Sequence, residues 1–411
     1  MLQAPLASPS AARAQGAGER RVFSFFYYWY EPLTAEFWNI VNHANLSNRF
    51  PESRPADWRS VDWFKGQFAD MAEANIDVAL AVYWGDNIYP ETPWSTHGLP
   101  RMVQALDEMV SDGLPAPTVG LFFDSYVLDG ANLTDPDRLD WMTSQLRTYF
   151  KLVPARHRAT QDGRPIIWLY LSNFANDFNQ DTFDELSDRL RDDLDGARPY
   201  WIAEVSWRNP TWTDGRGMRH FDPDRLISFD AFYRWGSASA GTLFAGRGLP
   251  IASVGPGYDD TAIADRGDER SARPREDGCF YARNWLKAQQ LGAQWVAVET
   301  WNELYEGSGI AETAEWGRDY IIATGTYSTA FKQNQPITLP AHCPGVLDDQ
   351  ATEPDDPFST LATDLDPTIA LPALYGSPTL AAGTPTARPT LTATPTPDPT
   401  PTPPLGNENG D

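Results

Sequence analysis

The chain has 411 residues, of which 41% are hydrophobic and 13% aromatic, enough apolar material for one large domain or two ordinary ones. Lysine and arginine number 32 against 56 aspartate and glutamate residues, so the formal net charge is −24, which would repel a phosphate backbone or an anionic membrane surface. No apolar run is long enough to cross a bilayer, and we expect neither nucleic-acid binding nor membrane insertion.

The first residues, 1–20, are rich in Ala, Pro and Ser. Ala12-Arg13-Ala14 resembles the small-residue end of a secretory signal, although an ordinary disordered leader fits the same letters. We expect this segment to lie outside the folded domain, which is predicted to span residues 21–345.

Within 21–345, eight apolar runs alternate with helix-like segments. The predicted strands are Val22–Tyr28, Ile76–Tyr83, Thr118–Phe123, Pro165–Tyr170, Tyr200–Val205, Leu226–Phe232, Pro250–Val254 and Trp295–Thr300. Helical periodicity covers Trp58–Ala74, Leu139–Leu152 and Tyr281–Leu291, with Gly292 ending the last helix. Eight β/α units predict an α/β fold, a single (β/α)8 TIM barrel, whereas a doubly wound sheet would show fewer strands.

Chemistry in such a barrel lies at the C-terminal ends of the strands. The residues there are acidic and aromatic: Trp29, Tyr30, Trp84, Asp124, Tyr126, Tyr170, Glu204, Asp230, Trp235 and the segment Glu299–Glu306. No GxSxG, HExxH or glycine-rich phosphate loop accompanies them. Carboxylates beside rings suit a glycosidase, because one carboxyl protonates the leaving oxygen while another assists attack at the sugar carbon.

Glu303 and Glu306 directly follow the last predicted strand, flanked by Trp301 and Tyr305. Mutual repulsion and partial burial would raise the pKa of one carboxyl, leaving an acid and a base near neutral pH. A solvated acidic loop fits the same spacing.

The segment Thr300-Trp301-Asn302-Glu303-Leu304-Tyr305-Glu306-Gly307-Ser308-Gly309-Ile310 resembles the signature of glycoside hydrolase family 99, the endo-α-mannosidase family. Ser253–Thr261, together with Arg266 and Gly278–Tyr281, is similar to the family's strand-seven loop and the helix after it. Phe26–Tyr30 and Val82–Gly85 resemble its first two strands, so the likeness extends from Val22 to Phe331.

The resemblance implies a retaining endo-glycosidase that acts on an α-mannose-containing polysaccharide or glycan. We expect this enzyme to be secreted and to need no metal or cofactor. Glu303 would take the proton of the sugar 2-hydroxyl, so that O2 attacks the anomeric carbon and forms a 1,2-anhydro sugar. Glu306 would protonate the leaving oxygen and then activate water. Backside attack by O2 requires a 2-hydroxyl trans to the leaving group, as in an α-mannoside and not in an α-glucoside.

We expect the sugar subsites to be lined by residues that are equally compatible with packing: Trp29, Tyr30, Trp84, Asp124, Tyr126, Tyr170, Glu204, Trp235, Tyr258, Trp301 and Asn302. The chain departs from the family in three places. Asp124-Ser125-Tyr126 stands where the family has Glu-Pro-Tyr, Trp235 where it has Tyr, and Leu304 where it has Trp.

Glu204 and Glu299 have no obvious counterpart in the family. Either could contact substrate, but buried acids need partners, which favours pairing with an arginine such as Arg234 or Arg266.

Two other functions fit the sequence. The barrel could be a carbohydrate-binding or cell-surface protein that has lost turnover, since a fold does not prove activity. It could also be an inverting α-glucan hydrolase, in which Glu204 or Asp124 pairs with Glu306.

Two further features bear on location. Cys279 and Cys343 are the only cysteines, and they either pair in an oxidising compartment or are two unrelated buried thiols. Residues 346–411 are rich in Thr and Pro and predict an extended tether of unknown attachment. Tethers of this kind suit a secreted or cell-surface protein.

Overall fold

The structure, a computed structural model, describes residues 19–30, 49–85, 93–261, 263 and 270–344, all of which belong to one compact unit. The predicted leader up to residue 18, the predicted tail over 346–411 and Arg266 lie outside the described residues. None of the described helices combines the length and apolar character that a membrane span requires.

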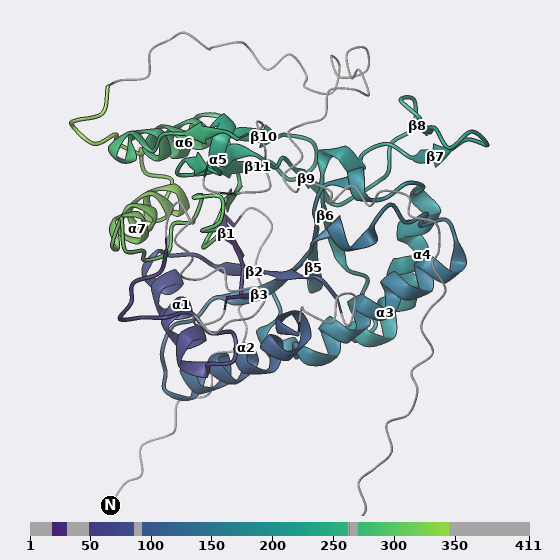
Figure 1. Ribbon diagram of the computed structural model, residues 1–411, viewed down its shortest axis with the longest axis horizontal. Coiled ribbons are helices and arrows are strands. Elements are labelled where there is room, and N and C mark those ends of the chain that lie inside the picture. The colour runs from purple at the N-terminus through teal and green to yellow at the C-terminus, as the bar shows by residue number, and fades with distance from the viewer. Residues whose placement is uncertain (1–18, 31–48, 86–92, 262, 264–269, 345–411) are drawn as a thin grey trace, which may run out of the picture. The chain divides into compact units, whose positions relative to one another are not determined.

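The core of the molecule is a mixed sheet that curves into a nearly closed barrel (Figure 1). Eight strands follow one another in parallel ladders, in the order β11 (Ile251–Val254), β14 (Trp295–Val298), β1 (Arg21–Phe26), β2 (Val78–Tyr83), β3 (Thr118–Phe123), β5 (Arg164–Leu169), β6 (Tyr200–Glu204) and β9 (Ala231–Tyr233). Two antiparallel strands are added, β10 (Leu243–Ala245) beside β11 and β4 (Thr160–Gln161) beside β5. The barrel closes between β9 and β11 without a ladder, by a single bridge from Ala231 to Gly248. The eight predicted runs correspond to these eight parallel strands.

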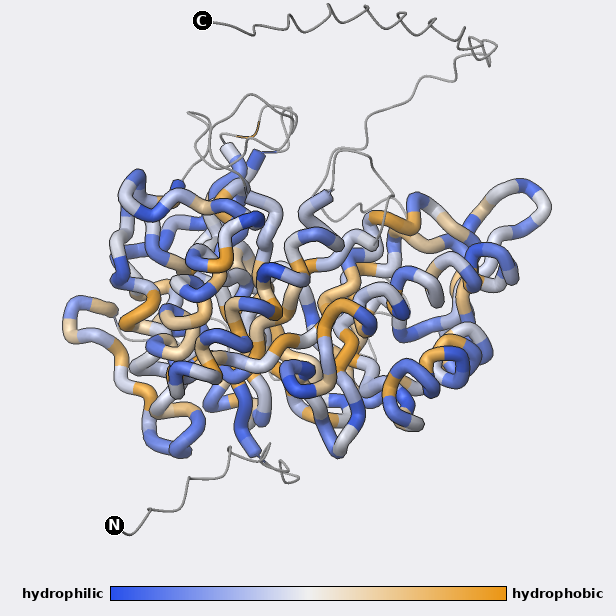
Figure 2. Tube along the Cα trace, turned by 90° about the horizontal axis from the view of Figure 1, so that it is seen from below, coloured by the Kyte–Doolittle hydropathy of each residue, from blue (hydrophilic) through white to orange (hydrophobic). Residues whose placement is uncertain are grey.

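The strands are continuous apolar runs because both of their faces are buried. Every residue of β1 and β2 is buried, as expected for parallel strands covered on both sides. Rings fill the barrel interior: Phe23 lies 5.4 Å from Trp168, and Phe25 lies 4.7 Å from Phe122, between ring centroids. Figure 2 shows the apolar residues concentrated toward the centre of the described chain, with hydrophilic residues outside.

In the described part of the chain, six helices of more than two turns surround the sheet: α1 (Val61–Glu73), α2 (Trp94–Ser111), α3 (Pro136–Leu152), α4 (Gln180–Leu190), α6 (Cys279–Gln290) and α7 (Asp319–Lys332). α1 begins where the Ser60 side chain accepts a hydrogen bond from the Trp63 N–H, and it buries Phe64, Phe68 and Met71. α6 ends just before Gly292, whose φ of 73° suits glycine, so this predicted helix end is confirmed.

Shorter elements connect the units. They are the 3-10 turns η1 (Ser125–Leu128), η2 (Ala155–His157), η3 (Ser172–Phe174), η4 (Arg191–Leu194), η5 (Val205–Trp207) and η7 (Glu276–Gly278), and the antiparallel pair β12 (Tyr258–Asp259) and β13 (Ala272–Arg273).

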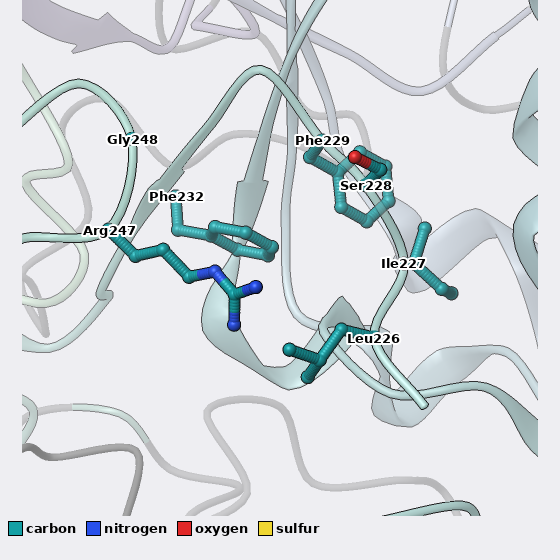
Figure 3. Close-up of a pocket in the computed structure, with 7 residues that line it drawn as sticks. All are labelled: Leu226, Ile227, Ser228, Phe229, Phe232, Arg247 and Gly248. Atoms are coloured by element: carbon teal, nitrogen blue, oxygen red, sulfur yellow. The ribbon is translucent and has the colours of Figure 1, made fainter. Parts of the chain in front are cut away.

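Neither of the two connections that flank β9 contains a helix of more than one turn. The connection from β6 to β9 holds only η5 and the hairpin of β7 (Thr211–Thr213) and β8 (Arg219–Phe221), and that from β9 to β11 holds the one-turn α5 (Ser237–Ala240) and β10. A pocket opens here, lined by Leu226, Ile227, Ser228, Phe229, Phe232, Arg247 and Gly248 (Figure 3). Because most of these residues precede β9 and β11, the pocket lies toward the N-terminal ends of the strands, away from the predicted carboxylates.

The sixth predicted strand begins later than expected. Asp230, predicted within the strand and read as a strand-end residue, precedes β9, where its carboxylate binds Arg164 at 2.6 Å and accepts the Trp201 N–H at 2.9 Å. This ion pair fixes Asp230 at the N-terminal end of the strand. The prediction that it lies at the catalytic edge is therefore wrong.

Candidate active site

Glu303 and Glu306 lie in a tight turn that follows β14. The Thr300 hydroxyl accepts the Glu303 N–H at 2.7 Å, and Glu303 Oε1 accepts the Tyr305 N–H at 3.0 Å. The carbonyl of Glu303 also accepts the Ser308 N–H at 3.1 Å, which brings the two ends of the turn together. The Glu303 carboxylate is thereby held at a fixed place by its own turn.

Neither glutamate is turned out to bulk solvent. The exposed fraction is 1% for Glu303 and 6% for Glu306. A solvated acidic loop, which the sequence left open, is therefore not what the chain forms here. Buried carboxylates at the C-terminal end of a barrel strand are the arrangement expected of catalytic acids and bases.

Asn302 joins this turn by hydrogen bonds to Tyr27, which directly follows β1. Its Oδ1 accepts the Tyr27 N–H at 2.8 Å, and its Nδ2 donates to the Tyr27 carbonyl at 2.7 Å. The Tyr30 hydroxyl donates to the Asn302 carbonyl and accepts the Leu304 N–H at 3.1 Å. Both side chains were predicted to bind substrate. In the structure they orient the turn, and contact with substrate stays a prediction.

Trp301 points to the outside of the barrel. Its indole N–H donates to Gln67 Oε1 of α1 at 2.8 Å, and the ring is fully buried. The structure therefore does not bring Trp301 together with the other predicted subsite residues.

The strand-seven loop lies against the same turn. The Asp259 N–H donates to the Glu306 carbonyl at 2.8 Å, which places β12 beside Glu306. Tyr258, predicted to bind substrate, is buried and donates through its hydroxyl to Asp260 at 3.1 Å.

Arg275 holds the far side of the turn, and sequence reasoning missed it. Its Nη2 donates to the carbonyls of Gly307 and Gly309, at 2.8 and 2.7 Å. The guanidinium carbon lies 4.3 Å from the centroid of Tyr320. Nothing local in the sequence separates this buried arginine from a surface one.

Four buried carboxyl groups, from the ends of three strands, act electrostatically on Tyr170. Burial raises the pKa of this tyrosine well above its usual value. The pKa is raised further by the charges of four acids, Asp124, Glu306, Glu299 and Glu204. Asp124 follows β3, Glu204 ends β6, and the other two follow β14. All four acids were predicted to lie at strand ends, and together they contribute to the raised pKa of Tyr170.

Asp124 is held at the barrel mouth by two donors. The indole N–H of Trp84 donates to Oδ2 at 2.8 Å, and the Tyr126 N–H donates to Oδ1 at 3.1 Å. Burial raises the pKa of Asp124 to about 6, although the two hydrogen bonds act to lower it. A carboxyl with this pKa can exchange a proton near neutral pH.

An aromatic cluster extends from this acid. The rings of Trp84 and Tyr126 lie 5.5 Å apart, and Trp29 lies 5.8 Å from Trp84. All three were predicted to line subsites. The structure brings them together, and Tyr126 is the one that keeps a partly exposed surface.

Trp235 lies over the interior of the barrel. Its ring is stacked on Phe122, 5.9 Å away at 15°, and meets Phe25 at 4.9 Å and Tyr170 at 5.1 Å. The residue is only half-buried, so a flat aromatic surface lies beside Tyr170.

The extra acids differ in their partners. Burial raises the pKa of Glu204. The Ser206 N–H donates to its Oε2 at 2.7 Å, and both this hydrogen bond and the charge of Arg234 lower the pKa. Glu299 accepts the Gly236 N–H at 2.9 Å, and burial raises its pKa to about 8. The predicted arginine neighbour thus fits Glu204, whereas the Glu299 carboxylate lies at the start of α5.

Among the described residues, one group of three possible metal ligands comes together, Cys279, His342 and Cys343. Cys279 and Cys343 are joined in a disulfide, so their sulfurs are not available as thiolates. This settles the alternative of pairing or separate thiols in favour of pairing.

The fold of the barrel is similar to that of two solved structures of glycoside hydrolase-like proteins. A family 99 glycoside hydrolase, the endo-alpha-mannosidase from Bacteroides thetaiotaomicron in complex with BIS-TRIS-propane, matches with a TM-score of 0.55 and 16% identity, over 77% of this chain and 98% of that one. A protein described as a glycoside hydrolase-like protein matches with a TM-score of 0.56 and 14% identity, over 78% and 97%. At these identities the likeness is one of fold.

The chain belongs to the family described as Domain of unknown function (DUF5010), whose model matches residues 32–337. No curated protein matches the sequence. The predicted resemblance to family 99 is therefore supported for the fold, while the family to which the chain is assigned is a different one.

Proposed function

We propose that this protein is a retaining endo-glycosidase that cleaves an α-mannose-containing polysaccharide or glycan. The observation that carries the proposal is the position of Glu303 and Glu306, both buried in one fixed turn at the C-terminal end of the last barrel strand. The half-buried Trp235 supplies a ring surface nearby, suited to the apolar face of a sugar.

In the first step Glu303 takes the proton of the 2-hydroxyl while O2 attacks the anomeric carbon. The bond from that carbon to the leaving oxygen breaks, and Glu306 gives this oxygen its proton. The product of the step is a 1,2-anhydro sugar. Glu306 then takes a proton from water, and the water oxygen attacks the anomeric carbon. The bond from that carbon to O2 breaks, and O2 recovers its proton from Glu303. Two inversions give net retention.

We further propose that the protein is secreted or displayed at the cell surface. The disulfide between Cys279 and Cys343 supports an oxidising compartment. A Thr/Pro-rich tail fits the same location, since it can hold a folded domain away from a surface.

The proposal is tested by incubating the full chain with α-mannans and α-glucans. Released oligosaccharides and their initial anomeric form are followed by NMR, with Glu303→Gln and Glu306→Gln as matched inactive variants. Internal cleavage of mannan with retention, lost in both variants, is the expected result. Inversion on an α-glucan would instead indicate that Asp124 or Glu204 works with Glu306. Binding without products would indicate a carbohydrate-binding protein on the same barrel.

A further inference from the structure

The hairpin β7–β8 carries an exposed aromatic pair that has no part in the proposed reaction at Glu303 and Glu306. The hairpin replaces the helix expected between β6 and β9 and stands out at the edge of the barrel (Figure 1). Trp212 and His220 face each other across its two strands. Their rings are stacked, with centroids 5.4 Å apart and an interplanar angle of 23°.

This pair is held in a fixed orientation while remaining open to solvent. The His220 ring nitrogen Nε2 lies 3.1 Å from the Asp214 carboxylate, which fixes the imidazole against the indole. Trp212 nevertheless keeps 47% of its surface exposed. An exposed, preorganised indole beside a carboxylate and an imidazole combines a flat apolar face with hydrogen-bonding groups.

The hairpin is tied to the edge of the barrel where the carboxylates lie. The backbone of Thr211 exchanges hydrogen bonds with Phe178, at 2.9 and 3.2 Å, and the Thr213 hydroxyl donates to Asp177 at 2.7 Å. Both partners lie in the loop that follows β5 and starts at Tyr170. Side chains alternate along a strand, so Trp212 points to the face opposite these two anchoring threonines.

We infer that Trp212 and His220 form an accessory subsite for a sugar unit of the polysaccharide, away from the bond that is cleaved. This inference rests on the proposed function. The indole would stack on the apolar face of the sugar, while Asp214 and His220 would bind its hydroxyls. A neutral sugar chain is also a ligand that the net charge of −24 does not repel.

The test separates long substrates from short ones. In Trp212→Ala, KM for the polymer is expected to rise about tenfold, the order expected for the loss of one stacked aromatic contact, with kcat unchanged. Kinetics on a short oligosaccharide that occupies the cleavage site alone should stay the same. Trp212→Tyr keeps a ring and should retain most of the affinity. Phe221→Ala is the matched control, because Phe221 is exposed on the same hairpin but pairs with Thr211 on its other face.

Binding is measured independently of turnover, by affinity electrophoresis of Glu306→Gln with and without Trp212→Ala in gels containing the polymer. Retardation that depends on Trp212 supports the inference even if no polymer is cleaved, in which case only the hydrolase proposal fails. Equal retardation with and without Trp212, or an equal KM for the polymer, overturns the inference alone. A wild-type chain that neither binds nor cleaves any polymer overturns both.

Discussion

The guanidinium of Arg275 donates a hydrogen bond to the carbonyl oxygen of Gly309 at 2.7 Å. The same nitrogen reaches the carbonyl of Gly307 at 2.8 Å, so one buried cation holds the backbone that directly follows Glu306. Burial lowers the pKa of Arg275 below its usual value. An arginine guanidinium nevertheless stays protonated in proteins. On the proposed function, Arg275 is therefore a positioning residue for Glu306.

Replacing Arg275 by methionine should lower kcat strongly with little effect on KM. The two carbonyls would lose their donor, the turn would shift, and a displacement of about 1 Å can cost about a hundredfold in rate. The free energy of unfolding should fall by about 2–5 kcal/mol, because buried acceptors are left without partners. Steady-state kinetics and urea unfolding measure the two effects separately.

Arg275→Lys restores a cationic hydrogen-bond donor in a different geometry and should recover part of kcat. Arg273→Lys is the matched control, because Arg273 lies two residues away, is exposed, and donates to the Ser239 carbonyl at 2.8 Å instead. A folded Arg275→Met protein with the kcat of the wild type would contradict the positioning role.

The sequence predicted the strands and the place of the acids because both depend on local pattern. Buried parallel strands appear as continuous apolar runs, and the strand-end rule then gives a set of acidic and aromatic residues that includes Glu303 and Glu306. The family resemblance was needed to select these two from the set. The end of α6 was predictable for the same reason, since Gly292 terminates it locally.

The features that were missed depend on contacts between distant residues. The start of β9 is fixed by Asp230 and Arg164, which are 66 positions apart, and a window of sequence cannot show that pair. Arg275 and Trp212 have no signal of their own, because burial of an arginine and exposure of a tryptophan are properties of the folded chain. The partner of Glu299 is a backbone N–H, which no side-chain pattern records.

The two glutamates should respond differently to the leaving group. Glu306→Gln removes the proton donor, which should cost about a hundred- to ten-thousandfold in kcat on the natural polymer. An aryl mannoside with a dinitrophenolate leaving group needs no protonation, so its first step should be nearly unaffected in this variant. Glu303→Gln removes the base for the 2-hydroxyl and should lose activity on both substrates. Burst kinetics of phenolate release measure the difference, and equal losses in both variants would contradict the assigned roles.

Glu299 should make the fold less stable as the pH rises. Burial raises its pKa to about 8, above the 4.5 of the unfolded chain. The folded state therefore holds the proton more tightly, and the stabilisation is complete below pH 4.5 and lost as the pH rises through 8. The loss is on the order of 3–5 kcal/mol. Glu299→Gln should flatten this dependence, measured as the free energy of unfolding in urea at pH 5 and pH 8. The exposed Glu52→Gln is the control, and an unchanged slope in Glu299→Gln would show that other groups cause the dependence.

The disulfide should contribute stability without being needed for activity. It joins Cys279, the first residue of α6, to Cys343 across 64 positions. Closing a loop of this length restricts the unfolded chain, which corresponds to about 4 kcal/mol on the chain-entropy account. The double variant with serine at both positions should unfold at a lower urea concentration than the wild type, and dithiothreitol should not change its midpoint. Reduction of the wild type should move its urea midpoint toward that of the variant. At urea concentrations below the unfolding transition, the variant should remain active. Arg275 lies four residues before Cys279 and keeps its own hydrogen bonds to Gly307 and Gly309, in the turn that holds Glu303 and Glu306. A variant that stays folded but loses kcat would show instead that the disulfide, through the start of α6, sets the position of Arg275.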